Sequence, residues 1–217
     1  MRTMIYMLFY LLLSGFSLIG QEIVFKPVTS QIEMTAFKDA IAMETAKMSD
    51  IKANFIQTKK MEFLNEAIVS TGMLYFAEGK RLRWEYEKPY SFSFILNGAK
   101  AWMVNQNAVT ELNVNSNKML KEISELMMFG MGGASLFENR NFDFSFRSSE
   151  KLWEVILKPK SKEMKALYSQ VVLTFSMPSC IMESVRMVET SGDETLIQLK
   201  NQKINTKLSD ALFEGKK

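Results

Sequence analysis

Apolar and charged residues alternate strictly between Leu82 and Tyr86. Leu82, Trp84 and Tyr86 fall on one side of this alternation, and Arg83 and Glu85 fall on the other. A period of two is that of a β-strand with one dry face and one wet face. We therefore predict a strand here, with Trp84 and Tyr86 facing the interior and Arg83 and Glu85 facing water.

The same period recurs along most of the chain. The polar turn at Asn97-Gly98 is a strong hairpin signal, and Ser191-Gly192-Asp193 marks a second turn. We predict about ten or eleven strands at short intervals, with no βαβ spacing. Besides the strand just described, they are residues 51–63, 70–78, 91–96, 101–106, 109–114, 141–147, 152–159, 169–176, 181–189 and 194–205.

Two segments have helical spacing instead. Residues 31–49 are rich in Ala, Met, Glu and Lys, and they place apolar residues on one helical face. In residues 117–130, Leu120, Ile123 and Met127 fall on one face, and the segment runs into a glycine cluster at 130–133. This second helix is either docked on the sheet surface or a mobile cover over an apolar cavity.

An antiparallel sheet of this length has to close, form a sandwich or curl around its helices. Two or three helices are too few to cover it when flat. We therefore predict a mainly β (α+β) fold, a strongly curved antiparallel sheet or incomplete β-barrel. Its interior is expected to be rich in aromatic residues, with Phe92, Phe94, Trp102, Phe142, Phe144 and Trp153 joining the row of Leu82, Trp84 and Tyr86.

The N-terminus has the form of a secretory signal peptide. Arg2 precedes an apolar stretch over 4–20 that contains small residues, and the polar Gln21 follows it. We predict cleavage near Gly20/Gln21, although an uncleaved single-span anchor is the alternative. Because the one cysteine of the chain is Cys180, no lipid can be attached at the cleavage point. We expect residues 1–20 to be a signal peptide and residues 21–217 to form one exported domain.

Composition narrows the function. The chain of 217 residues carries a net charge of +3 without a basic run, which argues against nucleic-acid binding. It contains no histidine, so neither a Ser–His or Cys–His nucleophile nor a His-containing zinc site can be built. Cys180 is expected to be a small buried apolar residue. We therefore expect no enzyme activity, no metal and no cofactor.

Several short motifs, taken in order, resemble the LolA family, periplasmic carriers of outer-membrane lipoproteins. They are Phe55-x-Gln57-x-Lys59, Gly72-x-Leu74-x-Phe76, Arg81-Leu82-Arg83-Trp84-Glu85-Tyr86-x-x-Pro89, Asn97-Gly98-x-x-x-Trp102, Leu157-Lys158-Pro159, the Gly192 turn and Asn205-x-x-Leu208-x-Asp210-x-x-Phe213. The resemblance covers nearly all of the chain after the leader. It implies an incomplete barrel whose helices form a lid over a hydrophobic cavity.

The resemblance also implies a function and a site. The acyl chains of a lipoprotein, released by an inner-membrane ABC transporter, would occupy the cavity of a periplasmic monomer and pass to an outer-membrane acceptor. The resemblance places Trp84, Tyr86 and Trp102 at the cavity, and the alternation adds Leu74, Phe76, Leu82, Phe92 and Phe94 as candidate cavity residues. The implied lid residues are Leu120, Ile123, Met127, Met128 and Phe129.

One departure from the family concerns the lid. The family has an arginine two residues after the Gly-x-Leu-x-aromatic strand that latches the lid, but Glu78 occupies this position, so Arg81 or Arg83 is the candidate latch. Two other functions fit the same fold. One is an outer-membrane lipoprotein acceptor resembling LolB, and the other is a sensor that binds lipids or lipoproteins to report envelope stress.

Overall fold

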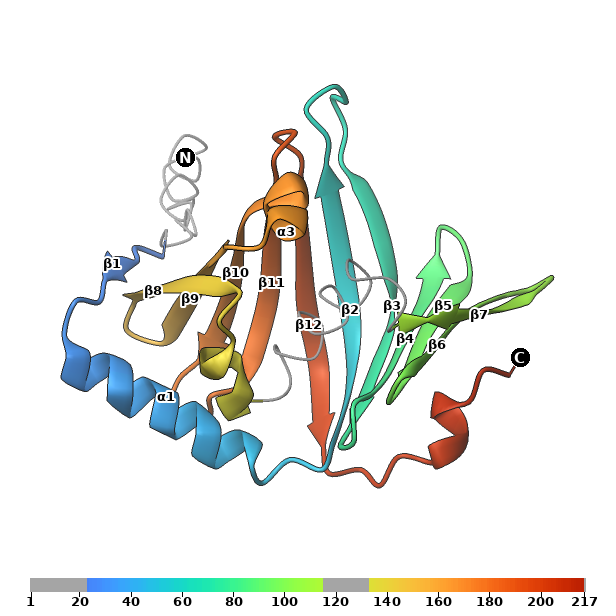
Figure 1. Cartoon of the computed structure of the whole chain (residues 1–217), viewed down its shortest axis with the longest axis horizontal. Helices are drawn as coiled ribbons and strands as arrows, with labels where there is room; N and C mark the ends of the chain where they lie inside the picture. Colours follow the sequence, from blue (N-terminus) through green and yellow to red (C-terminus); the bar gives the residue numbers. More distant parts are fainter. Residues whose placement is uncertain (1–22, 115–132, 217) are drawn as a thin grey trace, which may run out of the picture.

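The computed structural model describes residues 23–114 and 133–216. Within them, twelve strands form one antiparallel sheet (Figure 1). The strands are β1 (Lys26–Pro27), β2 (Asp50–Lys60), β3 (Ile68–Ala77), β4 (Arg81–Lys88), β5 (Phe92–Asn97), β6 (Lys100–Asn105), β7 (Val109–Asn113), β8 (Phe142–Ser148), β9 (Leu152–Pro159), β10 (Tyr168–Ser176), β11 (Met182–Glu189) and β12 (Glu194–Ile204).

The sheet consists of two meanders joined in the middle. One runs from β2 to β7 and the other from β8 to β12, and the pairing of β12 with β2 unites them. The short strand β1 forms one edge and β7 forms the other, so the sheet is not closed into a barrel. The predicted open antiparallel sheet is confirmed. It has one strand more than the upper prediction, because β1 spans only two residues and shows no alternation.

A glycine allows close packing of strands near the centre of the sheet. At Gly72 the register between β3 and β4 shifts. A Cβ atom at this position would lie 1.9 Å from the carbonyl oxygen of Glu85 and 2.9 Å from the ring of Phe55. Because real Cβ atoms do not approach so closely, only glycine fits here. Its missing side chain makes room for the Phe55 ring on one face of the sheet.

The helix α1 (Gln31–Thr45) lies across the β8–β10 part of the sheet (Figure 1). The side chain of Ser30 caps its N-terminus by accepting from the backbone N–H of Glu33. Phe37 packs among three aromatic residues of the sheet, and its ring is stacked on Trp153 with the centroids 4.3 Å apart. The helix ends four residues before the predicted boundary at residue 49, and Asp50 begins β2.

Three short helical segments were not predicted from the sequence. They are η2 (Gly133–Glu138), α3 (Lys162–Leu167) and η3 (Asp210–Phe213). The sequence of α3 is largely polar, and its one buried residue, Met164, packs in the core. In residues 23–114 and 133–216, no helix has the length and apolar character needed to span a membrane.

Candidate functional site

The strand β4 has two chemically different faces, as its alternation predicts. The sheet register pairs Trp84 with Leu74 on one side and with Phe94 on the other, and these three side chains share a face. We call this the inner face, since α1 packs on it, and the opposite one the outer face. The prediction that Trp84 and Tyr86 share a face opposite Arg83 and Glu85 is confirmed.

Most residues predicted to line the cavity lie on this inner face, and their burial changes along the strands. At one end Leu82 is fully buried and Leu74 is 1% exposed. Further along β4, Trp84 is still buried at 7% exposure, and Tyr86 is only half-buried. Phe76 is buried, and Phe92 and Phe94 are half-buried. The inner face therefore grades from closed core near Leu82 to a more open region near Tyr86.

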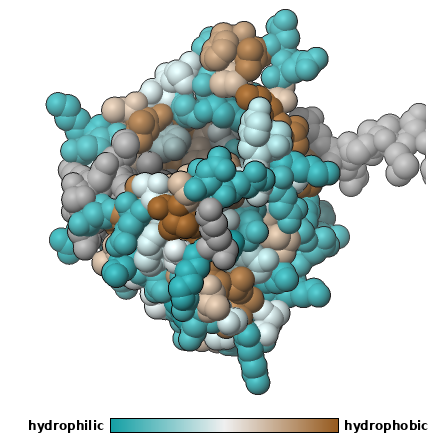
Figure 2. All heavy atoms as spheres, turned by 90° about the vertical axis from the view of Figure 1, so that its right-hand side faces the viewer, coloured by the Kyte–Doolittle hydropathy of each residue, from teal (hydrophilic) through white to brown (hydrophobic). Residues whose placement is uncertain are grey.

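Aromatic rings dominate the open region. Tyr86 is stacked on Phe92 with ring centroids 4.4 Å apart, and it meets the edge of Phe55 at 5.0 Å. Trp84 lies 5.3 Å from Phe55. Figure 2, which shows the β5–β7 side of the molecule, shows a hollow bordered by both hydrophilic and hydrophobic residues. Flat, rigid rings that are half-buried suit contact with a flexible apolar ligand.

Polar groups enter the inner face in order along β2. Its inward residues are Ile51, Ala53, Phe55, Gln57 and Lys59, which run from apolar to amide to charged. The hydroxyl of Tyr86 donates to Oε1 of Gln57 at 2.8 Å. Burial raises the pKa of Tyr86 to about 12, so the phenol stays neutral.

Charged groups mark the polar end of this gradient. Lys59 forms an ion pair with Glu189 of β11, with 3.0 Å between Nζ and Oε1. Tyr168 at the start of β10 lies near both groups, and burial followed by the charge of Glu189 raises its pKa. The inner face thus has a buried apolar end, an aromatic middle and a polar end, which matches the layout of an amphiphile.

Trp102 does not belong to this set. Its register partner on β5 is Ile95, which in turn pairs with Arg83, so Trp102 lies on the outer face. Met103 occupies the inward position beside Phe94. The prediction that Trp102 lines the interior is therefore wrong. A tryptophan in a half-polar strand can face either side, and the pairing register decides which.

Arg81 and Arg83 also lie on the outer face, where they hold the C-terminal segment. Arg81 forms an ion pair with Asp210 and lies over the ring of Phe213. Arg83 forms an ion pair with Glu85, and its Nη1 donates to the carbonyl oxygen of Leu212. The η3 segment covers this part of the sheet, so the outer face of β4 is not simply exposed to water. These partners lie away from the interior that a latch would close.

The other predicted residues concern the cover. Leu120, Ile123, Met127, Met128 and Phe129 lie outside the described residues.

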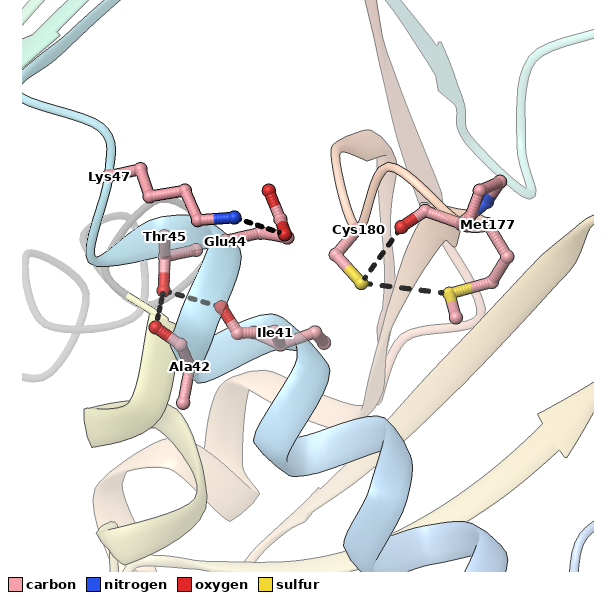
Figure 3. A network of polar contacts seen from close by, with 8 residues as sticks. Ile41, Ala42, Glu44, Thr45, Lys47, Met177 and Cys180 are labelled. Carbon is pink, nitrogen blue, oxygen red and sulfur yellow. Dashed lines mark hydrogen bonds and ion pairs between the residues drawn. The ribbon is translucent and has the colours of Figure 1, made fainter.

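Cys180 is buried in the core, as expected. Its thiol donates toward Met177 and Pro178, near the C-terminal end of α1 (Figure 3). Burial, and then the charge of Glu44, raises the pKa of Cys180, which keeps the thiol protonated and unreactive.

Sequence reasoning named Gln57 and Trp84 but did not identify the polar role of either side chain. Gln57 was seen only as part of a motif, and its contact with Tyr86 depends on pairing between distant strands. The indole N–H of Trp84 is buried without a hydrogen-bond partner among residues 23–114 and 133–216. The alternation along β2 already placed Gln57 on the same face as Phe55, and this was the available signal.

An open antiparallel sheet with an apolar, aromatic inner face defines the class of curved half-barrel binding proteins. The family model described as "Outer membrane lipoprotein carrier protein LolA" matches residues 46–216, and the chain belongs to this family. The outer-membrane lipoprotein carrier proteins of Legionella pneumophila strains Paris and Corby are each 24% identical over 185 residues. The alignment covers 82% of this chain and 88% of each relative.

One solved structure supports the fold, and a second is similar at a lower TM-score. An uncharacterised conserved protein from Thermus thermophilus is similar with a TM-score of 0.51 and 8% identity, over 83% of this chain and 92% of that one. A LolA superfamily protein from Nitrosomonas europaea is similar with a TM-score of 0.48 and 8% identity, over 83% of this chain and 96% of that one. At such identities the likeness concerns the fold alone.

Proposed function

We propose that this chain is a periplasmic carrier that binds the acyl chains of lipoproteins on the inner face of its sheet. It receives them from an inner-membrane ABC transporter and delivers them to an acceptor at the outer membrane. The mature protein begins near Gln21 after removal of the signal peptide, and it acts as a monomeric binding protein without catalysis.

One observation carries this proposal, namely the graded inner face. Leu82 and Leu74 close its apolar end, and the half-buried Tyr86, Phe92 and Phe94 leave its middle accessible. Burying an acyl chain stabilises a complex by about 0.8 kcal/mol per CH₂ group, so a long chain supplies ample binding energy. The half-open aromatic region leaves the bound acyl chain accessible, so that a partner can take it over.

The proposal is tested by what the exported protein binds. The full chain is expressed with a model lipoprotein in a host with two membranes, and the carrier is purified from the periplasm and examined by mass spectrometry. We expect acylated lipoprotein to co-purify. The matched control is the same lipoprotein with its lipid-acceptor cysteine replaced, which should not co-purify. Equal recovery of both forms would contradict a site for acyl chains.

Two variants separate the inner face from the surface. Phe94→Asp places a carboxylate among the half-buried inner residues and should abolish co-purification. Tyr90→Asp makes a comparable change at a side chain that is 79% exposed and should leave co-purification intact. Recovery in the outer-membrane fraction would instead favour the acceptor function. Ligand-dependent binding to a membrane regulator would favour the sensor.

A further inference from the structure

The interior contains a buried hydrogen-bond donor that the protein does not use. The side chain of Trp84 is 7% exposed, and its Nε1 has no partner within residues 23–114 and 133–216. The register directs this indole to the inner face beside Leu74 and Phe94. Because buried polar groups are nearly always paired, an unpaired one in a binding region indicates a partner supplied by the ligand.

A second donor, the side-chain amide of Gln57, lies on the same inner face. The Oε1 atom of Gln57 accepts from the hydroxyl of Tyr86 at 2.8 Å, which orients the Gln57 amide. This bond engages the oxygen and leaves the NH₂ group of the amide to donate. The rings of Trp84 and Tyr86 are stacked with their centroids 6.4 Å apart, so Tyr86 has the indole beside its ring and the Gln57 amide at its hydroxyl.

The position of these donors along the gradient suggests what they bind. On the Leu82 side of the two donors the inner face is closed and apolar. On the other side of Gln57 lies the ion pair between Lys59 and Glu189. A ligand that binds along this gradient places its hydrocarbon against the half-buried rings of Tyr86, Phe92 and Phe94 and its polar part toward the ion pair. The junction between hydrocarbon and polar part then falls beside Trp84 and Gln57.

We propose that Trp84 and Gln57 form a carbonyl-recognition site that binds the ester carbonyl oxygens of the ligand's acyl chains. The indole Nε1–H and the amide N–H groups donate to these oxygens. This inference rests on the proposed function and adds to it a selectivity for ester-linked over purely hydrocarbon or ether-linked chains, together with an orientation for the ligand.

A neutral carbonyl fits better than other acceptors. A carboxylate or phosphate at this depth would need a cation, and the nearby cation, Lys59, is already paired with Glu189. An ester oxygen accepts without carrying charge, and two ester-linked chains present two such oxygens. The neutral phenol of Tyr86 and the amide of Gln57 add no charge that an ester would have to neutralise.

The experiment compares two synthetic lipopeptides of identical peptide and chain length. One carries two ester-linked palmitoyl chains on a glyceryl cysteine, and the other carries two ether-linked hexadecyl chains, which lack the carbonyl oxygens. Affinities are measured by displacement of a fluorescent fatty-acyl dye from the mature protein. We expect the parent to bind the ester lipopeptide about tenfold more tightly, the factor that corresponds to about one net hydrogen bond.

Two variants locate the preference. Trp84→Phe keeps an aromatic ring and removes the N–H, so the ratio of ester to ether affinity should shrink by about threefold to tenfold, since lost packing would weaken both lipopeptides alike. The matched control is Trp153→Phe, the same change at the tryptophan stacked on Phe37 in the α1 region, which should keep the preference. Gln57→Leu should reduce the preference as Trp84→Phe does.

The outcomes distinguish this inference from the proposed function. If the parent binds neither lipopeptide, the proposed function fails. If the parent binds both equally, the carrier function stands and the carbonyl site is wrong, a result that needs no variant to fold. A Trp84→Phe protein that loses both lipopeptides equally would show that Trp84 acts through packing, and this would also overturn the inference.

Discussion

The guanidinium of Arg81 lies over the ring of Phe213, 5.3 Å from its centroid, and fastens the C-terminal segment to the outer face of the sheet. Phe213 is fully buried there, and Asn97 donates to its carbonyl oxygen. Gly215 follows in close contact with the Trp102 ring. Phe213 and Gly215 are thus part of the fold, on the face opposite the candidate site.

Phe213→Ala should destabilise the protein by about 3–5 kcal/mol, because it removes a fully buried aromatic ring and leaves a cavity. Urea unfolding of the mature protein measures the change. The matched control is Asp210→Asn, which breaks an ion pair whose acid is 87% exposed and should cost at most about 1 kcal/mol. Equal losses in the two variants would show that the ion pair, and not the ring, holds the segment.

Gly72→Ala should be strongly destabilising. The new Cβ would lie 1.9 Å from the Glu85 carbonyl oxygen, and backbone cannot give way as a flexible side chain can. We expect a loss of about 3 kcal/mol or more in the free energy of unfolding, measured in urea. The control is Gly98→Ala, where no atom lies within 4 Å and only a φ of +61° opposes the change. It should cost about 1 kcal/mol, and a larger loss there than at Gly72 would contradict this account.

Alternation alone sufficed to predict the sheet. Every predicted strand within the described residues is present, because a half-buried strand must place apolar residues at every second position. The same rule identified the shared face of Leu82, Trp84 and Tyr86. The short elements were missed for the converse reason, since two residues in β1 and one buried methionine in α3 leave no period to detect.

The candidate site was harder to predict, because it depends on which strands pair and in what register. Trp102 was assigned to the wrong face, since a shift of one residue reverses every side chain in a strand. Arg81 and Arg83 were expected near the cover, but their partners come from a segment about 130 residues further along the chain. The Gln57–Tyr86 contact likewise joins β2 and β4 across β3.

Asp50 should make stability depend on pH. Burial alone would raise the pKa of Asp50, but hydrogen bonds donated by Thr206 and Lys207 outweigh burial and hold the pKa below its usual 3.8. A carboxylate with a lowered folded-state pKa contributes stability that is present above the unfolded value and is lost as pH falls through the folded value. The contribution should therefore be constant from neutral pH down to about pH 5 and disappear below the normal Asp pKa.

The measurement compares the parent with Asp50→Asn by urea unfolding between pH 7 and pH 3. At neutral pH the variant should be less stable by about 2–4 kcal/mol, because its amide cannot accept all the hydrogen bonds that the carboxylate accepts. The difference should narrow as the parent protonates in acid. The matched control is Asp143→Asn, at a side chain that is 72% exposed and pairs with Lys160, and it should change the free energy of unfolding little. A stability difference between the parent and Asp50→Asn that stays constant down to pH 3 would show that the charge of Asp50 does not stabilise the fold.

Tyr86 gives a spectroscopic signal from inside the candidate site. Its pKa is raised to about 12 by burial. Ultraviolet titration of the folded protein should therefore show a late tyrosinate phase that Tyr86→Phe removes and Tyr90→Phe, at a 79% exposed position, preserves. Since the folded state holds this proton more tightly than the unfolded state, the free energy of unfolding should fall as pH rises from about 10 to about 12.

Bound ester lipopeptide should shift the ionisation of Tyr86 to still higher pH, because hydrocarbon displaces water from the half-buried phenol and disfavours its charged form. A late phase that survives in Tyr86→Phe would assign the signal to another tyrosine. A phase that the lipopeptide leaves unmoved would place the ligand away from the Trp84–Gln57–Tyr86 region.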